Sequence, residues 1–338
     1  MKKIRVLVVD DSMLFRESVI KELSKDEEIE IIGAAKNPFE ARNMIIKERP
    51  DVISLDIQMP KMDGIEFLKK LIPQYPIPVV MISSVSKKVF EALDAGAVDF
   101  VVKPETRLGI KKEEFVKEVI KKVKLASTAN VKRLKSHMEF VSASKTRNYN
   151  GKLIAIGAST GGTEATSKIL RELNENIPGI VIVQHMPKGF TKIYAERLNE
   201  TTFLNVKEAE EGDIIKPGHV FIAPGEKHIE IRKRNDDYYI KINNKEKVNG
   251  HKPSVDVLFK SVAKFAGKNA MGVILTGMGK DGAEGLLEMK KNGSYTIGQN
   301  KESCVVYGMP KAAHDINAVK KQLDIEEISK HITDYYNK

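Results

Sequence analysis

Residues 153–162 of this chain read LIAIGASTGG. A short apolar run ends there in small residues, and a segment compatible with a helix, Thr163 to Leu173, follows. This order predicts a buried strand, a tight turn and the start of a helix, because glycines allow backbone conformations that side chains forbid. Ser159 then lies at the carboxyl end of the strand, beside N–H groups that a helix start leaves free. A serine there can attack a carbonyl, and the N–H groups can hold the resulting oxyanion.

The spacing Gly157-x-Ser159-x-Gly161 matches the pattern of a nucleophile elbow. This stretch alone leaves two other interpretations open, a glycine-rich phosphate or nucleotide turn and a plain connection between strand and helix. Partner residues elsewhere in the chain have to decide among the three.

Length and composition predict an ordinary two-domain protein. The chain has 338 residues, of which 41% are hydrophobic and 30% charged, enough for two buried cores. No apolar run is long enough to cross a bilayer. The apolar run after the first three residues is too short for a signal peptide and ends at an acidic residue, Asp10. Cys304 is the only cysteine, so a reducing compartment fits and we expect a cytoplasmic protein.

The net charge of +10 raises the question of nucleic-acid binding. The lysines of segments such as 111–122 alternate with glutamates, a pattern typical of solvated helix faces. No helix-turn-helix or zinc-finger spacing is evident, so we expect no nucleic-acid partner.

Strand-like and helix-like segments alternate over the first 122 residues. The apolar, strand-like segments are 4–9, 29–34, 52–55, 79–82 and 100–102. The helical segments between and after them are 13–23, 38–47, 65–71, 89–93 and 111–125. Five such units predict an α/β fold with a doubly wound parallel sheet, whose ligand sites lie beyond the carboxyl ends of the strands.

Polar residues stand at those strand ends. Asp10 and Asp11 follow the first strand, Asp56 ends the third, and Ser83 and Lys103 follow the fourth and fifth. Three converging carboxylates favour a hard cation such as Mg²⁺, with Asp56 as nucleophile toward a phosphoryl group. Lys103 would pair with the phosphoryl oxygens and the Ser83 hydroxyl would bond them. Each residue alone has a plainer interpretation as a helix cap or surface side chain, but all of them at the right strand ends favour the site.

Residues 1–122 thus resemble a response-regulator receiver domain of flavodoxin-like topology. The segment between Ser84 and Ala95 looks about one helical turn shorter than in the receivers that it resembles. We expect this difference to concern the fourth helix, which lies on a face that receivers often use for output. Residues 123–150 lose hydrophobic periodicity, are polar and basic, and are expected to form a linker.

A second α/β domain is expected over residues 151–338. His185 follows the buried strand 180–183, Asp281 follows the strand 271–275, and segments 228–232 and 238–242 alternate like a hairpin. Ser159, His185 and Asp281 therefore follow different strands of one mostly parallel sheet and should meet at its rim. His185 could then act as general base and Asp281 could orient it. The order Ser, His, Asp differs from that of α/β-hydrolases.

Four segments here resemble the signatures of the CheB-type protein-glutamate methylesterase family of chemotaxis. They are residues 156–162, 184–187, 251–256 and 276–283, with the sequences IGASTGG, QHMP, HKPSVD and TGMGKDGA. With the receiver-like part, the resemblance spans the chain apart from the linker. It implies that Ser159 is the nucleophile, His185 the base and Asp281 its orienting acid. It also implies that Thr160 and the backbone around Met278 bind the oxyanion or substrate.

The resemblance further implies an activity. A histidine kinase would phosphorylate Asp56 in the presence of Mg²⁺, and this would activate hydrolysis of glutamate γ-methyl esters on the cytoplasmic helices of chemoreceptors, releasing methanol. Deamidation of receptor glutamines is implied too, and no cofactor is expected in the second domain. We expect a monomer without membrane insertion. The alternatives are a receiver-gated serine hydrolase acting on another ester or amide, a receiver-gated binding module, and a DNA-binding protein.

Overall fold

The computed structural model describes residues 2–84, 86–104, 110–129, 149 and 151–337. The chain divides into two compact units, Met1–Ser136 and His137–Lys338. Most of the linker expected at 123–150 lies outside the described residues. Within the described part of the chain, no helix is both long enough and apolar enough to span a membrane.

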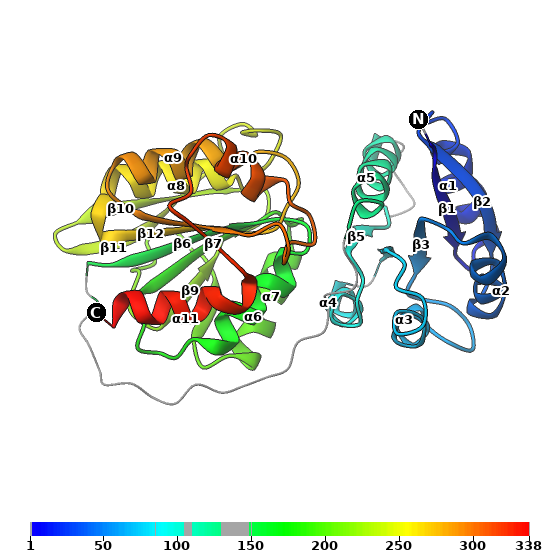
Figure 1. Ribbon diagram of the computed structural model, residues 1–338, viewed down its shortest axis with the longest axis horizontal. Helices are drawn as coiled ribbons and strands as arrows, with labels where there is room; N and C mark the ends of the chain where they lie inside the picture. The colour runs from blue at the N-terminus through cyan, green and yellow to red at the C-terminus, as the bar shows by residue number, and fades with distance from the viewer. Residues whose placement is uncertain (1, 85, 105–109, 130–148, 150, 338) are drawn as a thin grey trace. The chain divides into compact units, whose positions relative to one another are not determined.

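The first unit is built on a five-stranded parallel sheet, as the sequence predicts (Figure 1). The strand order is β2-β1-β3-β4-β5, so the direction of winding reverses between β1 and β3. The central strands β3 and β4 are buried along their whole length, which their runs of Val, Ile, Leu and Met explain. The strands are β1 (Ile4–Val9), β2 (Ile29–Ala35), β3 (Val52–Asp56), β4 (Val79–Ser83) and β5 (Asp99–Val102).

Five helices accompany this sheet. They are α1 (Met13–Leu23), α2 (Pro38–Glu48), α3 (Gly64–Leu71), α4 (Ser86–Asp94) and α5 (Ile110–Ala126). Helix α1 packs against α5, and α3 packs against α4. The first three helices begin after side chains that cap them, Ser12, Asn37 and Asp63.

The helices of this unit lie within one residue of their predicted boundaries, except at the start of α4. Helix α4 begins at Ser86, three residues before the expected 89–93. Helix α5 runs to Ala126, in agreement with the helix expected over 111–125, so the first residues of the expected linker continue this helix. Val123 and Ala126 are fully buried, and this packing carries the helix past the point where the sequence turns polar.

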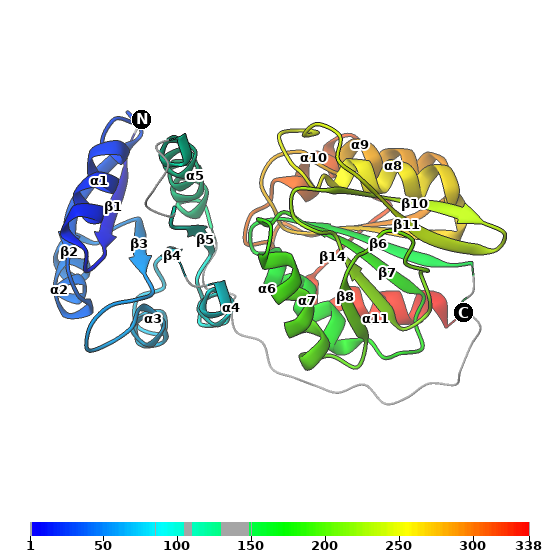
Figure 2. The same ribbon diagram turned by 180° about the vertical axis from the view of Figure 1, so that it is seen from behind.

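The second unit holds a seven-stranded sheet in which every pairing is parallel (Figure 2). The strand order is β14-β13-β12-β6-β7-β9-β8, with β6 in the middle. The strands are β6 (Leu153–Ala158), β7 (Gly179–Gln184), β8 (Asn205–Glu208), β9 (His219–Ile222), β12 (Ala270–Ile274), β13 (Tyr295–Gln299) and β14 (Lys321–Leu323). The edge strands β8 and β14 were not predicted, since both are short and largely polar.

Helices cover both faces of this sheet. In both views α8, α9 and α10 lie on one face, and α6, α7 and α11 lie on the other (Figures 1 and 2). The predicted hairpin is present as β10 (His228–Arg234) and β11 (Asp237–Asn243), and it forms a sheet of its own that packs on α8. The helices are α6 (Gly162–Glu172), α7 (Phe190–Thr201), α8 (Val255–Phe265), α9 (Ala283–Lys291), α10 (Met309–Asp315) and α11 (Ile325–Tyr336), with a 3₁₀ turn, η2, at Gly267–Asn269.

Helix α8 joins the core of this unit to its functional rim. Val255, Leu258, Phe259 and Val262 are fully buried, and their spacing places them on one face of the helix. Burying each such side chain contributes about 1.5–3 kcal/mol relative to exposure. This packing fixes the helix against the sheet and the hairpin, and so fixes the position of its first N–H groups.

Candidate active site

Three adjacent strands carry the predicted catalytic residues at their carboxyl ends. In the order β12-β6-β7, Asp281 lies in the loop after β12, Ser159 follows β6, and His185 follows β7. Backbone hydrogen bonds continue the pairing beyond the strands, from the His185 N–H to the Ala158 carbonyl oxygen and from the Ser159 N–H to the Thr276 carbonyl oxygen. The three loops are therefore tied together at the rim, as the strand-end rule predicts.

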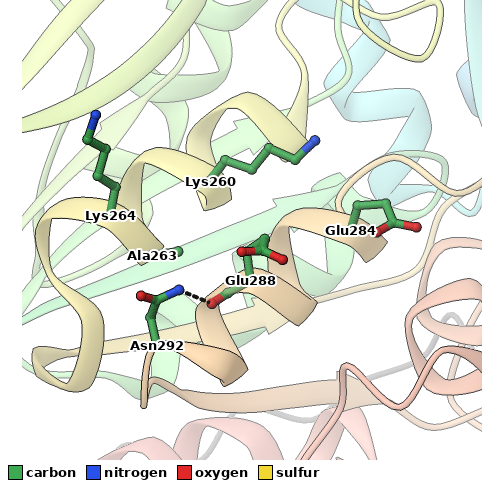
Figure 3. A pocket seen from close by; sticks show the side chains of 6 residues that line it. All are labelled: Lys260, Ala263, Lys264, Glu284, Glu288 and Asn292. Carbon is green, nitrogen blue, oxygen red and sulfur yellow. Dashed lines mark hydrogen bonds between the residues drawn. The ribbon is translucent and has the colours of Figure 1, made fainter.

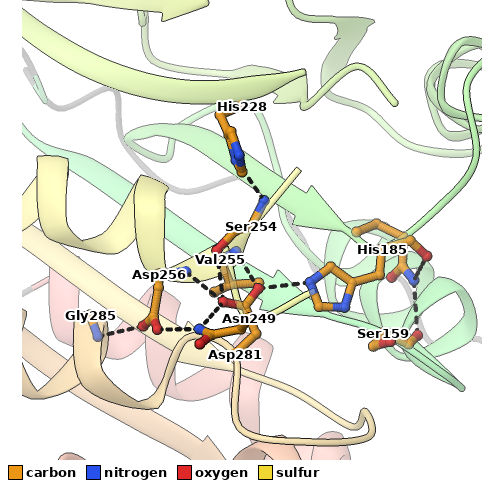
Figure 4. Close-up of polar contacts among 10 residues, drawn as sticks. Ser159, His185, His228, Asn249, Ser254, Val255, Asp256, Asp281 and Gly285 are labelled. Carbon is orange, nitrogen blue, oxygen red and sulfur yellow. Dashed lines mark hydrogen bonds and ion pairs between the residues drawn. The ribbon is translucent and has the colours of Figure 1, made fainter. Parts of the chain in front are cut away.

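His185 and Asp281 form a direct pair (Figure 4). The Nε2 atom of His185 lies 2.8 Å from Oδ2 of Asp281, and the side chains are 8% and 1% exposed. With Nε2 committed to the carboxylate, Nδ1 is the atom left to receive a proton. That Nδ1 atom is buried and has no hydrogen-bond partner among the described residues.

No hydrogen bond joins the Ser159 hydroxyl to the His185 ring among the described residues, although both follow neighbouring strands. Catalytic hydrogen bonds are often long in free enzymes and tighten when substrate binds. The structure therefore pairs two of the three predicted residues directly and places the third at the end of the strand between theirs.

Asp281 is held by five hydrogen bonds. Besides His185, its carboxylate accepts from the N–H groups of Val255 and Asp256 at 2.7 and 3.3 Å. The Ser254 hydroxyl donates at 2.7 Å and the Asn249 amide at 2.9 Å. Ser254 is the N-cap of α8 but makes no side-chain cap of its own, so the Asp281 carboxylate takes the place of a cap at the positive end of the helix.

These contacts keep Asp281 ionised. Burial raises the pKa of the Asp281 carboxyl, but the hydrogen bond and charge of His185 oppose it. The hydrogen bonds from Asn249 and Ser254 act in the same direction as His185, and the pKa lies well below its usual range. The carboxylate is thus a permanent negative charge behind the imidazole.

A second imidazole stacks on the first. The rings of His185 and His251 are 3.8 Å apart between centroids and 4° from parallel. This contact restrains the plane of the His185 ring while Asp281 restrains its edge. The ring is thereby fixed in two directions.

The turn that carries Ser159 requires glycine. Gly161 has φ of +75°, and a Cβ there would lie 2.6 Å from the Val305 Cβ. The Ser159 carbonyl oxygen accepts hydrogen bonds from the Gly162 N–H at 2.7 Å and from the Gln184 amide at 2.8 Å. The serine backbone is therefore held in one conformation.

Thr160 and Met278 lie in the two loops that meet at Ser159. Thr160 is buried, and its carbonyl oxygen accepts from the Thr276 hydroxyl at 3.0 Å. Met278 is 39% exposed and follows Gly277, where a Cβ would lie 2.7 Å from the Ser159 Cβ. Both predicted oxyanion or substrate residues are thus neighbours of Ser159 in chain or space.

The rim of the first sheet gathers the residues predicted for phosphorylation. Carboxylate oxygens of Asp10, Asp11 and Asp56 all lie within 4.8 Å of one another. Lys103 Nζ lies 2.8 Å from Asp10 Oδ2 and 2.7 Å from Asp56 Oδ2. Burial raises the pKa of Asp56, and the negative charge of Asp10 adds to it, although Lys103 opposes both. An all-oxygen set with uncompensated negative charge fits a hard divalent cation such as Mg²⁺.

Ser83 and Gly64 complete this rim. Ser83 is buried at the end of β4, and its carbonyl oxygen accepts from the Lys103 N–H at 2.9 Å. A Cβ at Gly64 would lie 2.1 Å from the Asp56 carbonyl oxygen, so only glycine lets α3 start this close to the end of β3. The sequence-predicted residues of the receiver-like unit are therefore all at one edge of its sheet.

A surface groove of about 640 Å³ lies between α8 and α9 of the second unit (Figure 3). Its lining residues are Lys260, Ala263, Lys264, Glu284, Glu288 and Asn292. Two lysines and two glutamates balance in charge, and the cavity holds no nucleophile. It is a surface groove rather than a second candidate for catalysis.

Sequence reasoning missed three contacts of the catalytic rim. It assigned no role to Asn249, to the Ser254 hydroxyl or to the stacked ring of His251. Ser254 followed by Val255 and Asp256 does carry a signal, because a helix start attracts anions. The sequence of this helix start does not show which carboxylate binds there. No feature of the sequence around Asn249 predicts its contact with Asp281.

The fold and the two rims define a class: a receiver-type unit joined to an α/β unit with the Ser–His–Asp arrangement of a serine hydrolase. The family model described as CheB methylesterase matches residues 154–332, and that of the response regulator receiver domain matches residues 6–117. The chain belongs to the CheB methylesterase family and carries a response-regulator receiver domain.

Similar proteins extend over the same length. One from Syntrophomonas wolfei, named protein-glutamate methylesterase/protein-glutamine glutaminase 2, is 52% identical, covering 97% of this chain and 96% of that protein. One from Salmonella typhi, named protein-glutamate methylesterase/protein-glutamine glutaminase, is 46% identical, covering 98% and 97%. The crystal structure of the Thermotoga maritima CheB methylesterase catalytic domain is 40% identical with a TM-score of 0.54, covering 55% of this chain and 98% of that domain.

Proposed function

We propose that this chain is a phosphorylation-activated protein-glutamate methylesterase that also deamidates glutamines. Its substrates would be γ-methyl glutamate residues on the cytoplasmic helices of chemoreceptors, and its action would adapt the chemotactic response. The observation that carries the proposal is the buried His185–Asp281 pair, with Nε2 and Oδ2 2.8 Å apart, in the loops after the two strands that flank β6, which precedes Ser159. The full-length similarity to proteins of that name supports the choice of substrate.

Hydrolysis would run through an acyl-enzyme. The Ser159 hydroxyl attacks the ester carbonyl carbon while His185 Nδ1 takes its proton, and Asp281 stabilises the imidazolium. Backbone N–H groups around Thr160 and Met278 hold the oxyanion. The intermediate collapses when the C–O bond to the methoxy group breaks, and His185 returns the proton so that methanol leaves.

Water completes the cycle. His185 takes a proton from water, the hydroxide attacks the acyl carbon, and the bond to Ser159 breaks with return of the proton to the serine oxygen. The product is a free glutamate carboxylate. With a glutamine side chain the same steps release ammonia, because the two carbonyl groups lie at the same distance from the main chain.

The receiver would control this reaction. A histidine kinase would supply the phosphoryl group, which one Asp56 carboxylate oxygen accepts. Mg²⁺, held by Asp10, Asp11 and Asp56, would neutralise charge on the phosphoryl oxygens. Lys103 and the Ser83 hydroxyl would then bond the new phosphoryl oxygens and shift the receiver to a second arrangement.

We assign the receiver to residues 1–122, the linker to 123–150 and the catalytic domain to 151–338. The receiver would need Mg²⁺ for phosphorylation, which its carboxylate-rich sheet edge would bind. The proposed chemistry of Ser159 needs no cofactor. The proposed protein acts in the cytoplasm as a monomer, without nucleic acid.

Methanol release from methylated receptor fragments tests the proposal. The wild type should release methanol, and a small-molecule phosphodonor with Mg²⁺ should accelerate it. Ser159→Ala should abolish release, Asp56→Asn should keep the basal rate and lose the acceleration, and Ser24→Ala on the receiver surface is the matched control. Turnover of small esters with none of the receptor fragments would overturn the substrate, and full activity in Ser159→Ala would overturn the hydrolase.

A further inference from the structure

A side-chain amide bridges two buried carboxylates behind the catalytic histidine (Figure 4). The Asn249 amide nitrogen donates to Asp281 Oδ1 at 2.9 Å and to Asp256 Oδ2 at 2.7 Å. An amide NH₂ group has two hydrogens, so one is available for each carboxylate. Asn249 therefore joins the orienting acid to a second acid that the proposed reaction does not use.

The second acid, Asp256, is buried and lies close to Asp281, so the Asn249 amide separates two like charges. Asp256 is 2% exposed, and its other oxygen accepts from the Gly285 N–H at 2.6 Å. Neither Asp256 nor Asp281 forms an ion pair with a lysine or arginine among the described residues. Burial raises the pKa of Asp256, and the negative charge of Asp281 adds to that rise. Two like charges thus lie close together in a buried place, with only neutral donors between them.

We propose that Asn249 is a positioning residue of the catalytic site, which fixes the Asp281 carboxylate with Oδ2 toward His185 and shields it from Asp256. The inference rests on the proposed catalytic roles of Ser159, His185 and Asp281. The Asn249 amide donates to Asp281 and Asp256 and makes no hydrogen bond to His185 among the described residues, so it acts on the reaction only through Asp281. One of its hydrogen bonds adds a side-chain donor to those of Ser254 and Asp256 at Asp281 Oδ1, and the other holds Asp256. The opposite oxygen, Oδ2, is thereby kept toward the imidazole.

A plainer explanation of Asn249 is conformational. Its φ is +54°, in the left-handed region that asparagine and glycine tolerate best. An asparagine could be there for its backbone alone. Asn249→Gly separates the two explanations, because glycine adopts this conformation without strain and has no amide. The residue is exposed at the surface, so its replacement leaves no cavity in the core.

The variants have a specific expected effect. Asn249→Gly and Asn249→Ala should each lower kcat for methanol release about tenfold, the size of one hydrogen bond to a charged group. KM should stay within about twofold, because the amide touches the orienting acid rather than the substrate. If Asn249 served only the backbone, Asn249→Gly would keep the wild-type kcat and only Asn249→Ala would lose activity.

The pH profile supplies a readout that a structural role would not move. Without the amide, the charge of Asp281 has one donor fewer on Oδ1 and is less offset, so the acid limb of kcat/KM should move to higher pH. The fall in kcat comes from the other effect of the change, the loss of a fixed carboxylate orientation. The other titratable groups at this site are His251 stacked on His185, Asp256, and His228, whose Nδ1 accepts from the Ser254 N–H. All three remain in the variants.

The experiment uses the full chain and methylated receptor fragments. Asn235→Gly is the matched control, since Asn235 has φ of +55° in the exposed β10–β11 turn, within the hairpin and outside the proposed catalytic loops. Circular dichroism and the urea midpoint report folding, and the position of the acid limb does not depend on the fraction of active protein. A wild-type kcat and acid limb in Asn249→Gly would overturn the proposal. Ser159→Ala in the same assay tests the hydrolase independently.

Discussion

Replacing Asp281 by asparagine removes the charge behind the imidazole and keeps the size of the side chain. In the wild type all five neighbours donate to the carboxylate, two to Oδ2 and three to Oδ1. An asparagine has one oxygen, so its NH₂ group must face donors on one side. If it faces His185, the imidazole proton moves to Nδ1 and the base is blocked. If it faces the other side, the buried N–H of Asp256 loses its acceptor.

The rate effect follows from the lost ion pair. In the proposed reaction a positive imidazolium forms beside a negative carboxylate, and His185 Nε2 and Asp281 Oδ2 are 2.8 Å apart. Two unit charges about 4 Å apart attract by about 4 kcal/mol at an effective dielectric constant of about 20. A loss of that size slows the reaction about 10³-fold. The wrong tautomer adds to it, and removal of the acid's charge from a serine triad costs about 10⁴-fold in a well-studied protease. We therefore expect kcat to fall between about 10³- and 10⁴-fold.

Stability should change with pH in the same variant. The folded-state pKa of Asp281 lies below its value in the unfolded chain, so the ionised group stabilises the fold above about pH 4. That contribution is lost as the pH falls through the folded pKa. Asp281→Asn lacks this contribution, and its stability should therefore fall less than that of the wild type between pH 7 and pH 3.

Two measurements check this. Methanol release gives kcat and KM, and urea unfolding at several pH values gives the free energy of unfolding. Asp281→Asn that folds, as judged by circular dichroism, and loses less than tenfold in kcat would refute the role of Asp281. Equal acid dependence of stability in the two proteins would refute the account of its ionisation.

Three other predictions rest on single contacts. His251→Ala should lower kcat up to about tenfold and His251→Phe should restore most of it, since a stacked ring contributes about 0.5–1.5 kcal/mol; equal rates in Ala and Phe would exclude stacking. Lys103→Ala removes the cation between Asp10 and Asp56, and the basal methanol release should persist while the phosphodonor no longer accelerates it; unchanged acceleration would contradict the role of Lys103. Cys304 is 4% exposed and burial raises the pKa of its thiol, so a thiol reagent should label it in urea and not in the native chain, and rapid native labelling would contradict its burial.

The fold was largely predictable because both sheets are parallel. Buried parallel strands give continuous apolar runs, which β3, β4, β6 and β7 show clearly in the sequence. Edge strands are half-exposed and short, so β8 and β14 leave no such run. Their place in the sheet is decided by pairing with a neighbour, which sequence periodicity does not record.

The convergence of the candidate site residues was predictable to the same extent, for a related reason. Ser159, His185 and Asp281 follow strands, and strand ends converge in a parallel sheet. Asn249 and His251 follow a hairpin that belongs to a different sheet, so no rule of strand order brings them to the rim. They reach it because β10 packs on α8, and α8 presents its first N–H groups to Asp281.

The two rims use buried aspartates in opposite ways. Asp281 takes five donors, two of them from a helix start, so its charge is satisfied and its pKa is low. Asp56 lies beside two further carboxylates with Lys103 as its cation, and its pKa is raised. A satisfied carboxylate is a poor nucleophile and a good fixed charge, whereas an unsatisfied one gains by accepting a cation and a phosphoryl group. An aspartate is therefore suited to the proposed role of permanent support in one unit and to the proposed modification in the other, and the difference lies in the number of donors that each sheet edge supplies.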